Sequence, residues 1–174
     1  MTIAPPLRFA LLFAAQFASL GAAMPFIPAA LSEGGLSATQ LSIVLALGSV
    51  TRLLTSPASA RLADRWGMRA VVVAGAALAA LTLPAMALLQ GFAVLLMVQL
   101  VHSVGVAPVV PLSDAAAIAE MRRRAFDYGR VRAWGSIAFI AAAVAAGQLV
   151  ALAGPAAALW LAACCLGEIG RAHV

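Results

Sequence analysis

Two opposite charges lie at the edges of two long apolar segments of the chain. Asp114 is near the end of one segment, and Arg132 begins the next, eighteen residues later. A charge in hydrocarbon costs at least ~2.5 kcal/mol, so such groups usually face an interior cavity and pair with each other. In an antiparallel hairpin with its link at residues 120–130, the two side chains would lie at similar depths. An Asp–Arg pair would then leave a guanidinium fork for a substrate carboxylate or hydroxyl group.

Each of these charges also has a simpler interpretation. Arg132 at a membrane flank could extend its charged head into water. Asp114 could cap a helix that restarts after Pro111. Both alternatives stay open for each residue taken alone, whereas the occurrence of both charges in one hairpin favours a functional pair.

Four further polar side chains lie inside apolar segments. Arg52 is eight residues before Ala60, about 12 Å along a helix, and we interpret it as a second buried charge. It either extends to the membrane surface or lines a cavity that attracts an anionic substrate. Gln16, Gln99 and His102 are the other three, and Gln99 and His102 share a helix face at i, i+3. We expect His102 to be a hydrogen-bonded packing group rather than a proton carrier.

The composition is that of a membrane protein. The 174 residues are 64% hydrophobic and 10% charged, with a mean hydropathy of +1.05, whereas soluble domains are roughly half apolar. The net charge of +5 is spread over short links, so nucleic acid is not an expected partner. The adjacent Cys164 and Cys165 indicate neither a disulfide nor a metal site, and no cofactor is expected. All basic residues are arginine, and alanine is abundant, which suggests a bacterial source.

Six apolar segments are near the roughly 20 residues that a membrane-spanning helix needs, the last being short. The predicted spans are 7–31, 39–60, 70–89, 92–119, 133–153 and 155–167. Arginines follow the second and fourth spans, and the first, third and fifth links carry none. This bias predicts a cytoplasmic N-terminus in a bacterial inner membrane, with Trp66 and Trp134 at the cytoplasmic interface.

Paired prolines recur in the first and fourth spans. Pro25 and Pro28 lie about eighteen residues into the first, and Pro108 and Pro111 about sixteen into the fourth. Each span would begin a set of three helices, and the two sets would run in opposite directions. This pattern is typical of a 3+3 inverted repeat with broken helices at a transport cavity. Chance is the alternative, because proline is tolerated in membrane helices.

The end of the chain, residues 168–174, breaks the apolar pattern abruptly. Its sequence resembles the translation of a widely used sequencing adapter. We therefore expect a native domain of residues 1–167, forming the N-terminal half of a longer protein, followed by a non-native tail.

Residues 60–69 resemble the signature loop of the major facilitator superfamily, Gly-x-x-x-Asp-Arg/Lys-x-Gly-x-Arg/Lys. The loop falls in the expected link between spans two and three, with alanine in place of the first glycine. The resemblance implies that Asp64 controls the switch between inward-open and outward-open states. The matching positions are Asp64, Arg65, Gly67 and Arg69. The alternative is a charged turn whose side chains are merely solvated.

Residues 126–136 resemble the start of helix five in the lactose-permease branch of this superfamily. The resemblance implies that Asp114 and Arg132 form the ion pair of the sugar site. Phe139 stands where that branch has a sugar-stacking tryptophan, which argues against a lactose-like sugar. The likeness extends to bacterial permeases of phenylpropionate through 111–115, 127–136 and 52–54. Further candidates within the motif are Tyr128, Arg130 and Trp134.

The sequence thus predicts an all-α membrane protein, the N-terminal six-helix half of a twelve-helix transporter. The resemblance implies proton symport of a small organic solute, with an aromatic carboxylate such as 3-phenylpropionate as the leading interpretation. A nucleoside or oligosaccharide symporter is the alternative, and a structural or channel-like membrane protein is the alternative from another class. An enzyme is not expected, because Gly-x-Ser-x-Gly and His-Glu-x-x-His motifs are absent. The expected partners are the substrate, protons, the lipid bilayer and the missing C-terminal half.

Overall fold

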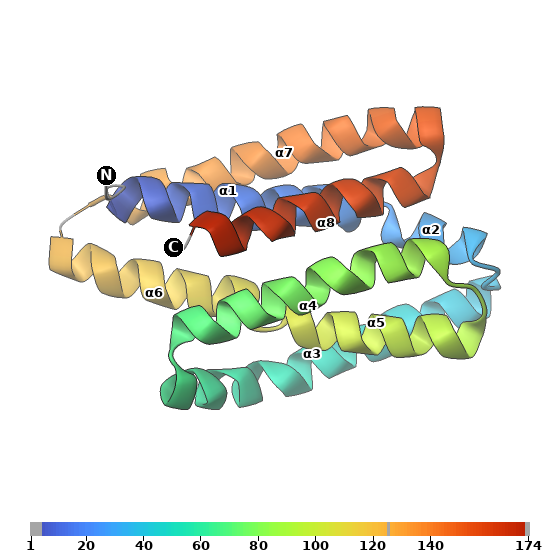
Figure 1. The fold of residues 1–174 in the computed structure, drawn as a ribbon, viewed down its shortest axis with the longest axis horizontal. Coiled ribbons are helices and arrows are strands. Elements are labelled where there is room, and N and C mark those ends of the chain that lie inside the picture. Colours follow the sequence, from blue (N-terminus) through green and yellow to red (C-terminus); the bar gives the residue numbers. More distant parts are fainter. Residues whose placement is uncertain (1–4, 125, 173–174) are drawn as a thin grey trace.

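The computed structural model describes residues 5–124 and 126–172, and within these residues all regular structure is helical. The helices run roughly along the long axis of one elongated bundle (Figure 1). In chain order they are α1 (Pro5–Ala23), α2 (Ile27–Glu33), α3 (Ala38–Trp66), α4 (Met68–Leu88), α5 (Phe92–Val106), α6 (Val109–Arg124), α7 (Tyr128–Ala153) and α8 (Pro155–Ala172). The predicted all-α membrane class is confirmed.

Five helical segments of the described chain are long and apolar enough to cross a membrane. They are Pro6–Ala23, Ala38–Trp66, Met68–Leu88, Phe92–Arg124 and Tyr128–Ala153. The sixth predicted span is present as a shorter apolar helix, Pro155–Ile169. The first span ends at Ala23, earlier than the predicted residue 31, whereas the second, fourth and fifth spans extend into their arginine-bearing ends. The link expected at 120–130 is therefore helical on both sides, and Arg132 lies about one turn inside α7.

The prolines of the first and fourth spans interrupt both helices. The chain turns at residues 24–26 between α1 and α2, and at residues 107–108 between α5 and α6. Proline breaks a helix because it lacks the N–H donor and its ring clashes with the preceding turn. Pro57 and Pro84, by contrast, are accommodated inside α3 and α4. The two breaks exist as expected, while the inverted repeat itself stays a prediction.

Single glycines make the sharpest links. Gly67 alone separates α3 from α4, with φ of 86°, and Gly154 alone separates α7 from α8, with φ of 80°. A side chain would be strained at these positive φ values. Each glycine therefore lets the chain reverse within one residue and places consecutive helices side by side.

Small residues let the helices approach closely. A Cβ atom added to Gly21 of α1 would collide with the backbone carbonyl of Phe139 on α7. The same holds between α4 and α5, where Gly75 faces the backbone of Gly105. Close backbone approach at small residues is the usual way in which membrane helices associate, because lipid tails offer no hydrophobic driving force. These contacts fix the rotation of α1 and α7 about their axes, and hence the direction of their polar side chains.

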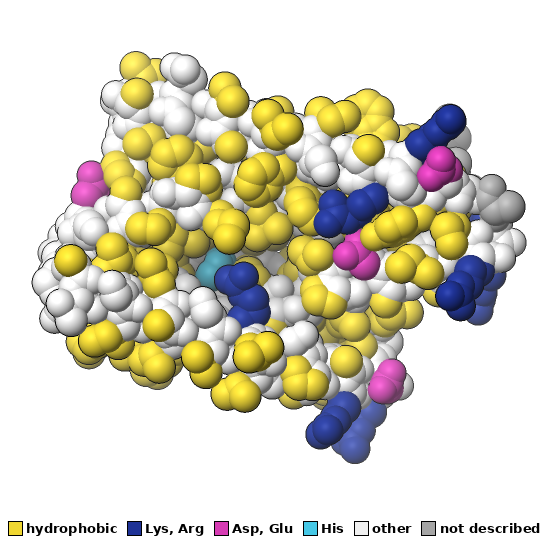
Figure 2. All heavy atoms as spheres, turned by 180° about the vertical axis from the view of Figure 1, so that it is seen from behind, with side chains coloured by type: hydrophobic (Ala, Val, Ile, Leu, Met, Phe, Trp, Pro, Cys, Tyr) yellow, Lys and Arg dark blue, Asp and Glu magenta, His cyan; other side chains and the backbone are white. Residues whose placement is uncertain are grey.

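Most charged side chains gather at one end of the bundle (Figure 2). This end holds the start of α1 and the links α3–α4 and α6–α7 (Figure 1). The opposite end, with the links α4–α5 and α7–α8, carries Glu33 at the end of α2 but no arginine among the described residues. The predicted orientation in the membrane rests on this distribution of arginines, and it stays a prediction.

Candidate functional site

An ion pair joins α6 to α7. Arg132 Nε lies 3.3 Å from Asp114 Oδ1, and the two side chains are 27% and 29% exposed. The hydroxyl of Tyr128, one turn before Arg132, donates a hydrogen bond to the same carboxylate oxygen at 2.9 Å. The structure thus brings together three candidates from the sequence in one cluster whose charges cancel.

The position of Asp114 within α6 removes one alternative. The helix begins at Val109, ahead of Pro111, so Asp114 lies in its second turn. A capping side chain must precede the first turn in order to reach the free N–H groups there. Asp114 is therefore not a helix cap, and its carboxylate contacts Arg132 and Tyr128.

The guanidinium of Arg132 also lies against aromatic rings of α1. Its central carbon is 3.9 Å from the ring centroid of Phe17 and 5.3 Å from that of Phe13. Gly135 leaves room for this stack, since a Cβ there would come within 3.0 Å of the Phe17 ring. Contacts between a cation and an aromatic face are worth about 0.5–2 kcal/mol. The stack fixes the plane of the guanidinium at the edge of an apolar surface.

The sequence interpretation missed these two rings. Phe9, Phe13 and Phe17 recur at intervals of four residues, which places them on one face of α1. That spacing was the available signal, although it cannot tell which helix lies opposite. The contact arises because α1 crosses α7 where Gly135 and Gly21 permit it.

A second polar location is a pocket of about 70 Å³ beside the two helix breaks. Arg52 of α3, Gln16 of α1 and His102 of α5 are among its lining residues. Arg52 is exposed, so the described helices do not bury it, and its role as a cavity residue stays a prediction. The reason is that this part of α3 packs few neighbours and presents Leu53 and Leu54, which are 75% and 69% exposed, to the surroundings. Figure 2 shows the molecule from the side where this surface is hollowed.

His102 is held by a hydrogen bond inside the bundle. Its Nδ1 lies 2.9 Å from Thr82 Oγ1, and this hydroxyl lies within hydrogen-bond distance of the carbonyls of Leu78 and Ala79. The hydroxyl has one hydrogen, so it either donates to a carbonyl and accepts from Nδ1–H of His102, or donates to Nδ1 itself, according to the tautomer of the imidazole. The imidazole is hydrogen-bonded and buried, in keeping with the expected packing role, which stays a prediction. Thr82 was not foreseen as its partner.

Gln16 and Gln99 are both buried, but in different surroundings. Gln16 is 1% exposed, and among the described residues neither its Oε1 nor its Nε2 has a hydrogen-bond partner. Gln99 shares the face of α5 with His102 but packs against Gly48 of α3. A buried polar group without a partner costs about 1–3 kcal/mol. Gln16 is therefore a group that a bound molecule or water would satisfy.

The remaining candidates of the helix-five motif lie apart from the ion pair. Phe139 is half-buried and contacts α1 through its backbone carbonyl at Gly21. Trp134 is 57% exposed, and Arg130 forms a surface pair with Asp127 at 3.5 Å. None of these three touches the Asp114 carboxylate in any contact found among the described residues.

The signature-loop residues lie at the arginine-rich end. Asp64 and Arg65 are exposed at the end of α3, Gly67 is the one-residue link, and Arg69 follows in α4. Within the described ranges, no ion pair joins Asp64 to another residue.

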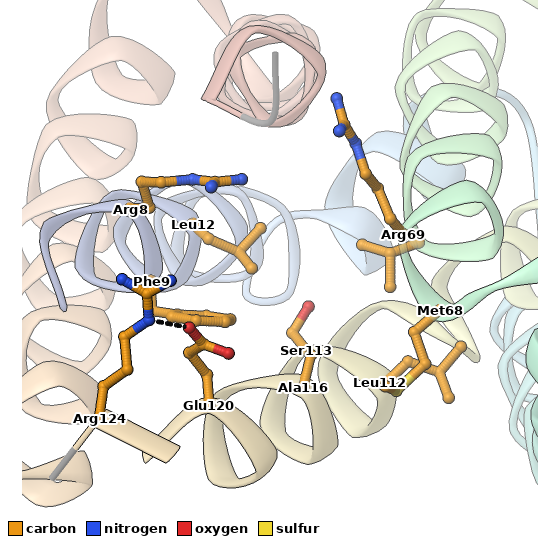
Figure 3. A pocket seen from close by; sticks show the side chains of 11 residues that line it. Arg8, Phe9, Leu12, Met68, Arg69, Leu112, Ser113, Ala116, Glu120 and Arg124 are labelled. Carbon is orange, nitrogen blue, oxygen red and sulfur yellow. Dashed lines mark ion pairs between the residues drawn. The ribbon is translucent and has the colours of Figure 1, made fainter. Parts of the chain in front are cut away.

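Arg69 lines a further pocket of about 280 Å³ that the sequence did not indicate. The pocket lies between α1, α4 and α6, and Arg8, Glu120 and Arg124 also line it (Figure 3). Arg124 Nε is 2.6 Å from Glu120 Oε1. The pocket is thus a charged recess at the arginine-rich end, distinct from the Asp114–Arg132 pair.

Comparison with known proteins gives the family. The sequence profile of the MFS_1 like family matches residues 7–169. The "Probable 3-phenylpropionic acid transporter" of Escherichia coli (strain K12) is 35% identical over 140 residues, covering 78% of this chain and 36% of that protein. The "Maltose permease" of Geobacillus stearothermophilus is 29% identical over 150 residues, covering 81% of this chain and 36% of that protein. The chain thus matches little more than a third of the length of these relatives. Together with the helical bundle, the match shows that the chain belongs to the MFS_1 like family of the major facilitator superfamily.

Proposed function

We propose that this chain is the N-terminal six-helix half of a proton-coupled secondary transporter. A second six-helix half would complete the molecule, in line with relatives of which the chain covers 36%. The charge distribution supports a bacterial inner-membrane protein with its N-terminus in the cytoplasm, because arginines favour the cytoplasmic end. Substrate would bind between the halves, which rock to expose the site to each side in turn.

The proposed substrate is a small organic solute, an aromatic carboxylate such as 3-phenylpropionate. The observation that carries the proposal is the Asp114–Arg132 pair, partly exposed within otherwise apolar helices and stacked on aromatic rings. Charged groups within membrane spans usually mark substrate or ion pathways. The name of the Escherichia coli relative supports the substrate class.

The proposed roles divide between two regions. Asp114 and Arg132 engage the substrate, and Phe17 provides an apolar surface beside them. Asp64 and Arg69 at the link between α3 and α4 would act in the switch between the two open states, as their motif implies. Arg69 already lines the charged recess between α1, α4 and α6, so a change in the packing of these helices would change its surroundings.

An oligosaccharide symporter is the second candidate. It is favoured by the match to a maltose permease, at 29% identity over a similar share of the chain. Nucleosides remain a further alternative within the same mechanism. The neutral Asp114–Arg132–Tyr128 cluster can also hydrogen-bond hydroxyl groups, because the guanidinium has five N–H donors and not all face Asp114.

The test is uptake of labelled 3-phenylpropionate into cells that express the full-length gene product carrying this chain. We expect uptake above that of empty cells, abolished by a protonophore and not competed by maltose or nucleosides. Competition by sugars or nucleosides would favour the alternative symporters. Absence of aromatic-acid uptake by a well-expressed protein would reject the proposed substrate.

A further inference from the structure

The two arginines on the substrate side of the helices differ in charge compensation. Arg132 is neutralised by Asp114 at 3.3 Å, and that carboxylate also accepts from Tyr128. Arg52 forms no ion pair within the described ranges. A carboxylate ligand that approached Arg132 would have to compete with Asp114, whereas at Arg52 it would meet an uncompensated positive charge. On electrostatic grounds, Arg52 is therefore the better partner for an anion than Arg132.

The pocket beside the helix breaks has the composition of a small anion site. Arg52 is the single Lys, Arg, Asp or Glu among its lining residues, so no fixed negative charge opposes an anion there. His102 at the same wall is held by Thr82 through Nδ1, which fixes its ring in place. Apart from Gln16 and Ser19 the other lining residues are apolar, and an apolar wall strengthens the interaction between a cation and a bound anion.

Gln16 provides the observation that points to a ligand. Its side chain is 1% exposed, lines this pocket, and has both polar atoms without a hydrogen-bond partner among the described residues. Buried amides are normally satisfied, and leaving one unpaired costs about 1–3 kcal/mol. Both polar atoms are closed off from the pocket in this structure, so a carboxylate oxygen there would accept from Nε2 of Gln16 once the amide turns toward it, which would remove part of that cost.

The break between α5 and α6 adds a third favourable element. Val109 and Val110, the first two residues of α6, line the pocket. The N-terminal turn of a helix carries free N–H groups and partial positive charge, which favour an anion. The charge of Arg52, the amide of Gln16 and this helix start therefore act on the same small space.

The size of the pocket limits what it can hold. A single water needs roughly 10–15 Å³ of such space. The pocket offers about 70 Å³, which is room for a carboxylate and its neighbouring carbon but not for an aromatic acid as a whole. The rest of the ligand must leave the pocket toward the exposed side on which Arg52 lies.

We propose that the pocket lined by Gln16, Arg52 and the start of α6 binds the carboxylate of the transported acid, while the neutral Asp114–Arg132 pair contacts the remainder. This inference rests on the proposed function and refines it by assigning the two ends of the substrate. The chemical class that it requires is a monocarboxylate whose apolar part extends from the acid group.

The test is equilibrium binding to the purified full-length gene product in lipid nanodiscs. Two probes are compared, 3-phenylpropionate and 3-phenylpropan-1-ol, which share the ring and chain but differ in the carboxylate. Arg52→Gln should weaken binding of the acid about 10- to 100-fold and change binding of the alcohol by less than about 3-fold, since a hydrogen bond to a charged group is lost. Gln16→Leu should weaken acid binding about 3- to 10-fold.

The matched control is Arg61→Gln, which removes an exposed arginine about two and a half turns further along α3, outside the pocket. It should leave both affinities unchanged. Should Arg52→Gln fail to fold, Arg52→Lys replaces it. Arg52→Lys should keep the wild-type preference for the acid over the alcohol, and Gln16→Leu should still reduce that preference.

Two results would overturn the assignment while leaving the proposed function intact. One is an unchanged acid preference in Arg52→Gln, and the other is loss of that preference in Arg132→Lys while Arg52→Gln retains it. Absence of aromatic-acid binding by the wild type would instead reject the proposed substrate, and the carboxylate assignment with it.

Discussion

Replacing Arg132 by lysine separates charge from shape at the ion pair. Lysine keeps the positive charge opposite Asp114, so the pair can persist. It loses the planar fork that now places Nε 3.3 Å from the carboxylate and stacks on Phe17 at 3.9 Å. Lysine and arginine are not equivalent where geometry, rather than charge alone, positions a ligand.

The structure gives the size of the expected loss. The stack on Phe17 is worth about 0.5–2 kcal/mol, and the charge-assisted contact of the guanidinium with Asp114, which a lysine would keep only in part, about 1.5–3 kcal/mol. Arg132 is 27% exposed, so solvent screening favours the lower part of both ranges. A net loss of about 2 kcal/mol is expected, which corresponds to about a 30-fold fall in transport efficiency.

The assay is the initial rate of 3-phenylpropionate uptake over a range of concentrations, normalised to the amount of protein in the membrane. Arg123→Lys is the control, because Arg123 is an exposed residue of α6 at the same end of the bundle. Its uptake should match the wild type. If Arg132→Lys also stays within about 2-fold of the wild type, the arginine is only a membrane flank, and the reasoning that places it at the substrate is refuted.

Two further predictions concern packing in the same full-length protein. Gly21→Ala should lower the thermal unfolding temperature markedly, because the new Cβ collides with the carbonyl of Phe139. Gly167→Ala is the control and should not lower it, because a Cβ there meets nothing within 4 Å. Equal unfolding temperatures for the two variants would contradict the close approach of α1 and α7. Thr82→Val should destabilise the protein by about 1 kcal/mol, measured by the same unfolding assay, because it removes the hydrogen bond with His102 Nδ1; a variant as stable as the wild type would show that this bond contributes nothing.

The parts of the fold that the sequence predicted follow from one-dimensional patterns. The apolar runs indicated the spans, and the distance from Asp114 to Arg132 indicated a hairpin with paired charges. The helix breaks were indicated by prolines, but Pro57 and Pro84 lie in continuous helices. Whether a proline interrupts a helix depends on neighbouring helices and side chains that re-satisfy the freed backbone groups, which local sequence does not specify.

The parts that could not be predicted depend on how each helix is rotated about its axis. In a membrane, apolar residues on every face give no strong amphipathic signal, and small residues decide which faces meet. Phe17 therefore reaches Arg132, and Thr82 reaches His102, through contacts that no spacing along one helix reveals. The exposure of Arg52 could not be predicted for the same reason, because depth along α3 says nothing about which side of α3 is covered.

Helix rotation also decides that Arg132 meets a carboxylate while Arg52 does not, and this difference bears on the choice of substrate. A neutral solute with hydroxyl groups gains from the compensated Asp114–Arg132 pair but gains little from a lone positive charge. An acid gains from both regions, because Arg52 supplies the charge that Asp114 cancels at Arg132. A sugar hydroxyl can also accept from a guanidinium or an amide, but only an anion gains the full Coulomb attraction of an arginine without a paired carboxylate. If the proposed carboxylate site is right, Arg52→Gln should therefore reduce binding of an acid more than binding of a sugar.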